Sequence, residues 1–370
     1  MSRPALVMLV ALVAGLGALI RPVAAAPGPA PSVLIGLQAP MTGPLAKQGQ
    51  DLEAAVRMAL AEDASRGKLP AIGLRIADDK GDPREGVLAA RQLLASGVLG
   101  VVGPWNSGVT LPVTAEVYGP AGLAVLTMST NPRITERGLR QVFRVIGRDD
   151  RQGRIAATEA LKLGCRSAVV LDNRAAYGQG LADAFARAFA AGGGTVRLRE
   201  SVTSGDTDHS PLLARIRSLR PDLLYLGTEY QDAGPLARQW RRVGGGKTRL
   251  FAGDAVRDPL FIRLAGAAAA EGTLITFPEP TAKRFEDRLR ARGREPGAFS
   301  GHAYDAARLL IQAIRKSGPG ATRKTVAHHV GTVSGFPGVT GRIDFDPRGD
   351  LNRSGFTLWQ VREGRFQVLR

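Results

Sequence analysis

Short apolar runs alternate along the chain with longer segments in which apolar residues recur every three or four positions. Residues 47–61, for example, place Leu52 and Val56 on one side of a helix, whereas the runs 33–37 and 72–77 are typical of strands. Strands that are separated by helices usually pair in parallel, with helices covering the sheet. The pattern therefore predicts an α/β fold of parallel sheets flanked by helices.

This alternation occurs in two successive series, which predicts two similar lobes. One series precedes Arg148, and the other begins there and continues to about residue 277. Lobe 1 is expected to comprise residues 32–147 and 278–337, and lobe 2 residues 148–277 and 338–370. Because short strand crossings would join the lobes, the arrangement suits closure about a hinge.

After residue 277 the pattern changes from helices to short strands. A helix over 303–316 would bury the face formed by Ala303, Ala307, Leu310 and Ile314. Strands at 341–345 and 356–361, followed by a turn at Glu363-Gly364 and a last strand, predict a hairpin-like end of the chain.

Residues 1–26 have the pattern of a secretory signal peptide. Arg3 precedes the apolar stretch 5–20, which is short for a membrane span, and small residues lead up to Ala26. We expect cleavage after Ala26 and an exported protein. Since no cysteine follows the cleavage position, a lipid anchor is not expected.

The composition argues against a nucleic-acid partner. The formal net charge is +17, but the basic residues are scattered among Asp and Glu along the predicted helices, which is typical of solvated helix faces. Cys165 is the only cysteine, so the fold must depend on buried apolar surface and not on internal disulfides.

The sequence offers no constellation typical of an enzyme or a metal site. The neighbouring histidines His328 and His329 would point to different sides of a helix, and no GxSxG motif is present. The acidic group around Asp82 is explained by a helix that begins at Pro83 with Asp82 as its cap. We therefore expect no catalytic residue, no cofactor and no metal.

The loop GPWNSGVT, residues 103–110, follows the apolar run 98–102 and nearly matches a phosphate-binding loop. Val109 stands where that motif has lysine, so phosphate transfer is not expected. Glycines that allow close approach and the hydroxyl of Ser107 suit a small anion such as a carboxylate. An ordinary strand-to-helix turn with Ser107 as the cap is the alternative.

A second hydroxyl-rich loop follows the strand 124–127. It contains Met128, Ser129 and Thr130, and Pro132 disfavours helix at the residue before it. In a parallel sheet the carboxyl ends of strands lie at one edge, where ligands bind. The two loops therefore predict a small polar cradle, although Ser and Thr are also common in loops that bind nothing.

Taken together, these residues resemble the periplasmic leucine/isoleucine/valine-binding proteins of ABC importers, the type I substrate-binding proteins. The likeness covers nearly the whole mature chain in the same order. It rests on Gln38-Ala39-Pro40-Met41-Thr42-Gly43-Pro44, Asp78-Asp79 with Asp82-Pro83, Gly103 with Ser107, Thr130-Asn131-Pro132 with Ile134-Thr135, Tyr177-Gly178-Gln179-Gly180, and Gly253-Asp254.

The resemblance implies two Rossmann-like lobes joined by a three-crossing hinge, with one amino acid clamped between them. It implies that Ser107 and Thr130 bind the α-carboxylate, aided by the backbone of Met128 and Ser129. It further implies that Asp254 accepts the α-ammonium. Tyr177 would close over the ligand, and Tyr304 matches a tyrosine of the family that could equally pack a helix.

Three residues leave the side-chain specificity open. Glu229 and Gln48 stand at positions that are often aromatic in relatives that bind aliphatic amino acids. With Asp254, Glu229 would favour a polar or basic amino acid or an amide; alternatively it pairs with a nearby arginine. Trp105 could form the floor of the pocket or pack against the sheet.

The resemblance implies a monomeric solute-binding protein that delivers its ligand to the membrane permease of an ABC importer. The same closed lobes could instead be presented to a membrane receptor, which would make the protein a sensor. An amide or an organic or aromatic acid is the alternative to an amino acid as ligand.

Overall fold

The computed structural model describes residues 33–67, 70–353 and 355–369. The predicted signal peptide lies outside the described residues.

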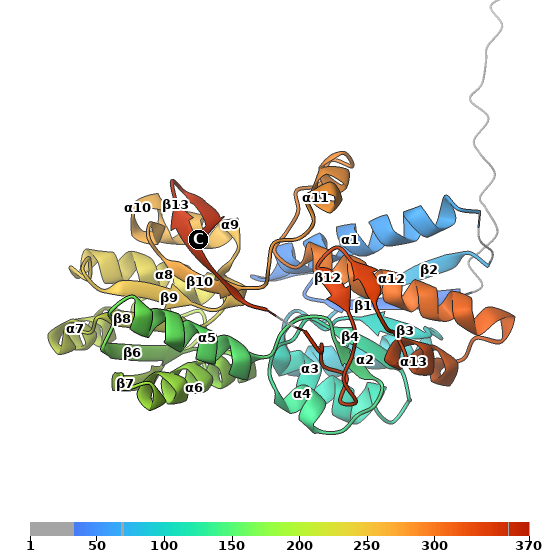
Figure 1. The fold of residues 1–370 in the computed structure, drawn as a ribbon, viewed down its shortest axis with the longest axis horizontal. Helices are drawn as coiled ribbons and strands as arrows, with labels where there is room; N and C mark the ends of the chain where they lie inside the picture. Colours follow the sequence, from blue (N-terminus) through green and yellow to red (C-terminus); the bar gives the residue numbers. More distant parts are fainter. Residues whose placement is uncertain (1–32, 68–69, 354, 370) are drawn as a thin grey trace, which may run out of the picture. The chain divides into compact units, whose positions relative to one another are not determined.

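One five-stranded sheet has the order β2-β1-β3-β4-β5, and all its neighbouring strands are parallel (Figure 1). The order reverses at β1, so β1 and β3 form a switch point of the kind where α/β sheets bind ligands. The strands are β1 (Val33–Ala39), β2 (Ile72–Asp78), β3 (Gly100–Val102), β4 (Ala124–Thr127) and β5 (Val142–Arg144).

The helices that accompany this sheet follow the predicted periodicity. In α12 the four residues of the predicted face are at most 3 % exposed. The side chain of Asp82 caps α2 by accepting from the backbone N–H of Arg84 and Glu85. The helices are α1 (Ala46–Ala64), α2 (Pro83–Ala95), α3 (Ser107–Val113), a π-helical turn (Thr114–Tyr118), α4 (Arg133–Glu136), α11 (Lys283–Arg290), α12 (Ser300–Ser317) and α13 (Arg323–Gly331).

A seven-stranded sheet has the order β14-β13-β10-β9-β8-β6-β7 (Figure 1). Its strands from β6 to β10 are parallel, and β13 and β14 are added antiparallel at one edge. The strands are β6 (Ser167–Asp172), β7 (Thr195–Ser201), β8 (Leu223–Gly227), β9 (Arg249–Ala252), β10 (Leu274–Phe277), β13 (Thr357–Arg362) and β14 (Arg365–Val368).

The central strands β6 and β8 are buried along their whole length, as expected for parallel strands covered on both faces. The helices of this part are α5 (Asp149–Lys162), α6 (Ala176–Ala191), α7 (Ser210–Leu219), α8 (Tyr230–Arg242), α9 (Pro259–Ala265) and α10 (Ala267–Ala270), with a short 3-10 turn at Asp254–Val256. The predicted α/β fold of parallel sheets flanked by helices is thereby confirmed.

The end of the chain differs in part from the prediction. β12 (Gly341–Ile343) pairs with β11 (Phe336–Gly338) in a separate two-stranded sheet and does not continue into the hairpin of β13 and β14. The backbone N–H groups of Val339 and Thr340 donate to Asp305 of α12. The sequence prediction assigns these two residues to lobe 2, whereas their bonds go to a helix beside the first sheet. The exact lobe boundaries stay a prediction.

In the part of the chain that the structure describes, no helix combines the length and apolar character that a membrane crossing requires.

Candidate functional site

The loop after β3 is held so that the Ser107 hydroxyl is directed to the next loop. Asn106, and not Ser107, caps α3 by accepting from the backbone N–H of Val109 at 3.3 Å. The Ser107 hydroxyl accepts from the backbone N–H of Asn131 at 3.3 Å and is 1 % exposed. The alternative reading of Ser107 as a helix cap is therefore wrong.

Gly103 lets this loop approach β1 closely. Its φ is +97°, and a Cβ atom there would lie 2.1 Å from the backbone oxygen of Gln38. Any larger residue would push the loop away from the sheet, because both the φ value and the space demand glycine.

The loop after β4 is cross-linked to the first loop by hydroxyl groups. The hydroxyl of Thr127 donates to the carbonyl of Pro104 at 2.8 Å, and that of Ser129 lies 2.9 Å from the carbonyl of Trp105. Ser129 Oγ also lies 2.6 Å from the hydroxyl of Thr110. The Ser129 hydroxyl thus ties the loops together, whereas Thr130 does not belong to this cross-link.

Buried Arg144 holds the loop after β4 through hydrogen bonds. Its guanidinium donates to the carbonyl of Ser129, to the Thr135 hydroxyl at 2.9 Å and to Asp350 at 2.7 Å. Arg148 also donates to Asp350, at 3.0 Å. These charge-assisted hydrogen bonds hold the Ser129 carbonyl, and with it the backbone at 128–130, in one position.

Tyr177 and Asp254 come from the elements around the second sheet and are bonded to each other. The Tyr177 hydroxyl donates to Asp254 Oδ1 at 2.8 Å, and the backbone N–H of Ala255 donates to the Tyr177 oxygen at 3.3 Å. Burial raises the pKa of the Asp254 carboxyl, while the bonds from Tyr177 and Gln152 oppose the shift. Asp254 is 2 % exposed, so its charge has little access to solvent.

Asp149 is a site residue that the sequence interpretation missed. It is 0 % exposed, and neither carboxylate oxygen has a hydrogen-bond partner at ordinary distance and angle. Burial raises its pKa and the nearby carboxylate of Asp254 raises it further, whereas the Thr130 hydroxyl and the Arg144 guanidinium oppose the shift. The same two carboxylates raise the pKa of Tyr177, after burial, so these three side chains gather at one place.

The polar cradle and this carboxylate group are adjacent. The Asn131 side chain donates to the carbonyl of Ala176, next to Tyr177, at 2.8 Å. The backbone N–H of Asp149 donates to the carbonyl of Thr130 at 2.9 Å. The structure thus brings the predicted residues Ser107, Met128, Ser129, Thr130, Tyr177 and Asp254 together, with Met128 and Thr130 buried.

Glu229 belongs to the same electrostatic group. It precedes α8, is 4 % exposed, and accepts a hydrogen bond from the Asn173 side chain. Burial raises its pKa to about 7, and the carboxylates of Asp232 and Asp254 add to the shift. Among the described residues no arginine pairs with Glu229 at salt-bridge distance, so the alternative reading of a surface ion pair is not supported.

The start of α1 also contacts the second half of the chain. Gln48 donates to Asp258 at 3.2 Å, and the ammonium of Lys47 lies 3.1 Å from the same carboxylate. The hydroxyl of Tyr230 donates to the carbonyl of Pro44 at 3.1 Å. These bonds join α1, and Pro44 just before it, to Tyr230 after β8 and Asp258 after β9.

Two predicted aromatic residues serve packing. The Trp105 ring meets Phe299 edge to face with centroids 5.6 Å apart, and Trp105 is 4 % exposed. Tyr304 packs against Phe285 and donates to Glu62 at 2.5 Å. Tyr304 is therefore a helix-packing residue here, and not a neighbour of Ser107 or Asp254.

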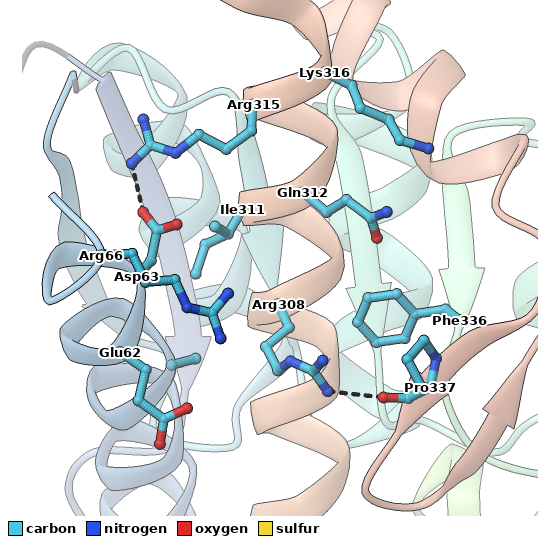
Figure 2. Close-up of a pocket in the computed structure, with 11 residues that line it drawn as sticks. Glu62, Asp63, Arg66, Arg308, Ile311, Gln312, Arg315, Lys316, Phe336 and Pro337 are labelled. Atoms are coloured by element: carbon cyan, nitrogen blue, oxygen red, sulfur yellow. Dashed lines mark hydrogen bonds and ion pairs between the residues drawn. The ribbon is translucent and has the colours of Figure 1, made fainter. Parts of the chain in front are cut away.

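A hollow of about 490 Å³ lies elsewhere, between α1, α12 and β11 (Figure 2). Arg315 pairs with Asp63, and Arg308 donates to the carbonyl of Pro337 at 2.9 Å, as the dashed lines show. These two arginines are bonded to other residues of the protein, whereas buried acceptors around Asp149 and Asp254 have no hydrogen-bond partner. The latter group is the candidate site.

The candidate site offers two kinds of recognition. Hydroxyl and backbone N–H groups of the two loops can donate to a carboxylate, and the carboxylates beside Tyr177 can accept from an ammonium. Within the described ranges, no group of three or more His, Cys, Asp or Glu residues is arranged to hold a metal ion.

The raised pKa values predict how the ligand-free protein responds to pH. Burial raises the pKa of both Asp79 and Glu229 to about 7, whereas unfolded carboxyls titrate at about 4. The folded state therefore binds protons that the unfolded state releases, so stability falls as pH rises through the folded pKa values.

We expect a higher melting temperature at pH 5.5 than at pH 8 when thermal unfolding is followed without ligand. Asp79→Asn combined with Glu229→Gln should reduce the difference. A protein that melts at a higher temperature at pH 8 would contradict this expectation.

Residues 32–365 match the family model described as periplasmic binding protein. The Leu/Ile/Val-binding protein BraC3 of Rhizobium johnstonii is 34 % identical, with 94 % of this chain and 96 % of that protein covered. Leu/Ile/Val-binding protein homolog 1 of Brucella melitensis is 33 % identical, over 90 % of this chain and 91 % of that protein.

Solved structures of similar fold include the leucine binding protein LivK from Thermotoga maritima. It has a TM-score of 0.84 and 28 % identity, over 91 % of this chain and 98 % of that one. A substrate-binding protein from Desulfitobacterium hafniense, in complex with Leu, has a TM-score of 0.76 and 26 % identity, over 91 % and 99 % of the chains. As the sequence resemblance predicted, the chain belongs to the periplasmic binding protein family, among the Leu/Ile/Val-binding proteins.

Proposed function

We propose that the protein is an extracytoplasmic solute-binding protein that captures an amino acid and delivers it to an ABC permease. The observation that carries this function is the pairing of a donor-rich cradle with a buried, unpaired carboxylate group. Ser107 and the loop at Thr130 suit an α-carboxylate, and Asp149 and Asp254 suit an α-ammonium. The names of the similar proteins, which bind leucine, isoleucine or valine, support the same class of ligand.

The proposed mechanism is closure of the lobes around the ligand. The loops after β3 and β4 would hold the carboxylate first, and Tyr177 and Asp254 would complete the site when the lobes close. Ligand contacts that exist only in the closed state shift the population toward that state. The bonds of Asn131 to Ala176 and of Lys47 to Asp258 would stabilise this form.

We also propose where the protein acts and which partner it has. The predicted signal peptide would direct the protein to the periplasm, where it would act as a soluble monomer without a cofactor and without catalysis. The permease would recognise the closed form.

Replacing Ser107 by alanine tests the carboxylate cradle. A hydrogen bond to a charged group contributes roughly 1.5–3 kcal/mol, so amino-acid affinity should fall about 10- to 100-fold. Isothermal titration of the mature protein measures the change, and circular dichroism checks the fold.

Ser218→Ala is the matched control, because this exposed serine bonds only within α7, to the carbonyl of Arg215 at 2.8 Å. Unchanged affinity in Ser107→Ala would remove Ser107 from the site.

A further inference from the structure

The candidate site holds more carboxyl groups than one α-ammonium can match. Asp149, Asp254, Glu229 and Asp232 are at most 5 % exposed. Among the described residues, no lysine, arginine or histidine pairs with any of the four at salt-bridge distance. Burying a charge without a partner costs free energy. A cluster of buried carboxyl groups without a cationic partner is therefore typical of a site where a positively charged ligand binds.

Two buried carboxylates outside the site do have cationic partners. Asp258 lies 3.1 Å from the Lys47 ammonium, and Asp350 lies 2.7 Å from the Arg144 guanidinium. The Arg144 guanidinium also acts on Asp149, but its hydrogen bonds go to Asp350, Thr135 and Ser129. Among the described residues Asp79 is also buried without a cationic partner, so the distinguishing feature of this site is that four such carboxyl groups lie together.

Within the group, Asp232 accepts more hydrogen bonds from the protein than Glu229 does. Asp232 accepts from Ser204 Oγ at 2.9 Å, from the backbone N–H of Gly205 at 3.2 Å and from Asn173 at 2.8 Å. Glu229 receives one side-chain hydrogen bond, from the same Asn173 amide. Asn173 thus fixes the Glu229 carboxylate and leaves acceptor capacity on it.

Two further buried acceptors near Glu229 lack partners. The Thr228 hydroxyl and the side-chain carbonyl of Gln48 have no hydrogen bond in the structure. Gln48 donates to Asp258, and both Asp258 and Glu229 raise the pKa of the Tyr230 phenol after burial does, so these groups lie near the same phenol. Because these buried acceptors receive no hydrogen bond from the protein, the site favours a ligand that supplies hydrogen-bond donors.

If Asp149 and Asp254 bind the α-ammonium, the Glu229 carboxylate is left to bind a second positive charge on the same ligand. We propose that this protein selects L-amino acids with a positively charged side chain, and that Glu229 is the residue that recognises that charge. The inference rests on the proposed function and narrows its ligand class, since the names of the similar proteins refer to aliphatic amino acids.

The test compares L-lysine with L-norleucine, which has the same carbon chain and lacks the side-chain ammonium. Isothermal titration of the mature protein should give L-lysine at least a tenfold lower Kd, because a charge-assisted hydrogen bond contributes about that much. Glu229→Gln should remove most of this preference while leaving L-norleucine affinity unchanged or improved. Glu229→Asp, which keeps the charge, should retain a preference for L-lysine.

Glu200→Gln is the control, because Glu200 pairs with Arg215 on the surface and should leave the ratio of the two Kd values unchanged. A wild-type protein that binds L-norleucine or L-leucine as tightly as L-lysine would overturn the inference and keep the proposed function. Tighter binding of L-glutamine than of L-lysine would overturn it as well, since a neutral amide would then be preferred. Failure to bind any of these amino acids would overturn both.

Discussion

Asp254→Asn is expected to weaken amino-acid binding by about 30-fold or more. Truncating one partner of a buried, hydrogen-bonded charge pair costs roughly 2–5 kcal/mol, and the proposed partner is the ligand's α-ammonium. The Asp254 carboxylate is 2 % exposed and receives a hydrogen bond of 2.8 Å from Tyr177. Asparagine keeps the size and the acceptor for Tyr177 and removes only the charge.

The same substitution should leave the ligand-free protein as stable as the wild type, or more stable. Burial raises the pKa of Asp254, which means that its charged form is disfavoured by the fold. A residue that costs stability and improves binding has a functional role and not a packing role.

Titration calorimetry and a thermal melt without ligand measure both effects of Asp254→Asn. Asp287→Asn is a matched control, because this side chain pairs with Lys283 on the surface at 2.9 Å. Unchanged affinity, or a variant that is clearly less stable without ligand, would contradict the assigned role.

Arg144→Met is expected to destabilise the protein by about 3–5 kcal/mol. Removing one partner of a buried ion pair leaves an uncompensated charge, which costs roughly that amount. Arg144 is 0 % exposed and bonds Asp350 at 2.7 Å. Methionine fills much of the volume, so the effect reports the lost bonds more than a cavity.

Ligand affinity should fall in Arg144→Met as well, because the guanidinium holds the carbonyl of Ser129, next to Thr130. Urea unfolding gives the stability difference, and titration of the folded fraction gives the affinity. Arg154→Met is the control: this side chain is 64 % exposed and should contribute less than about 1 kcal/mol. Equal unfolding midpoints for wild type and Arg144→Met would contradict the structural role of the network.

The helices and central strands could be predicted from the sequence because their signals are local. The predicted face of α12 is buried, and Asp82 caps α2 as its position before Pro83 indicates. The pairing of β12 could not be predicted in this way. It depends on β11, a three-residue strand whose sequence, Phe336-Pro337-Gly338, has no strand periodicity.

The members of the candidate site were predicted from two sources. Ser107 and Thr130 follow from the position of hydroxyl-rich loops at strand ends, whereas Tyr177 and Asp254 depended on the family resemblance. Asp149 was missed because an acidic residue in the first turn of a helix is ordinary in a sequence. Only the folded structure shows that Asp149 is buried and that neither of its carboxylate oxygens has a hydrogen-bond partner.

Hydrogen-bond partners that lie far apart along the chain could not be predicted either. Asn173 reaches Glu229 and Asp232 across a turn in which Arg174 has a positive φ of 62°. Nothing in the sequence around residue 173 distinguishes this asparagine from one that caps its own turn.

The most direct test of the account is a thermal-shift screen of the mature protein against L-amino acids, small amides and organic acids. A ligand at a hundred times its Kd should add about 2.7 kcal/mol to the free energy of unfolding. The account predicts that L-amino acids raise the melting temperature and that Asp254→Asn abolishes the shift. Stabilisation by organic acids or amides alone, with none from any amino acid, would contradict it.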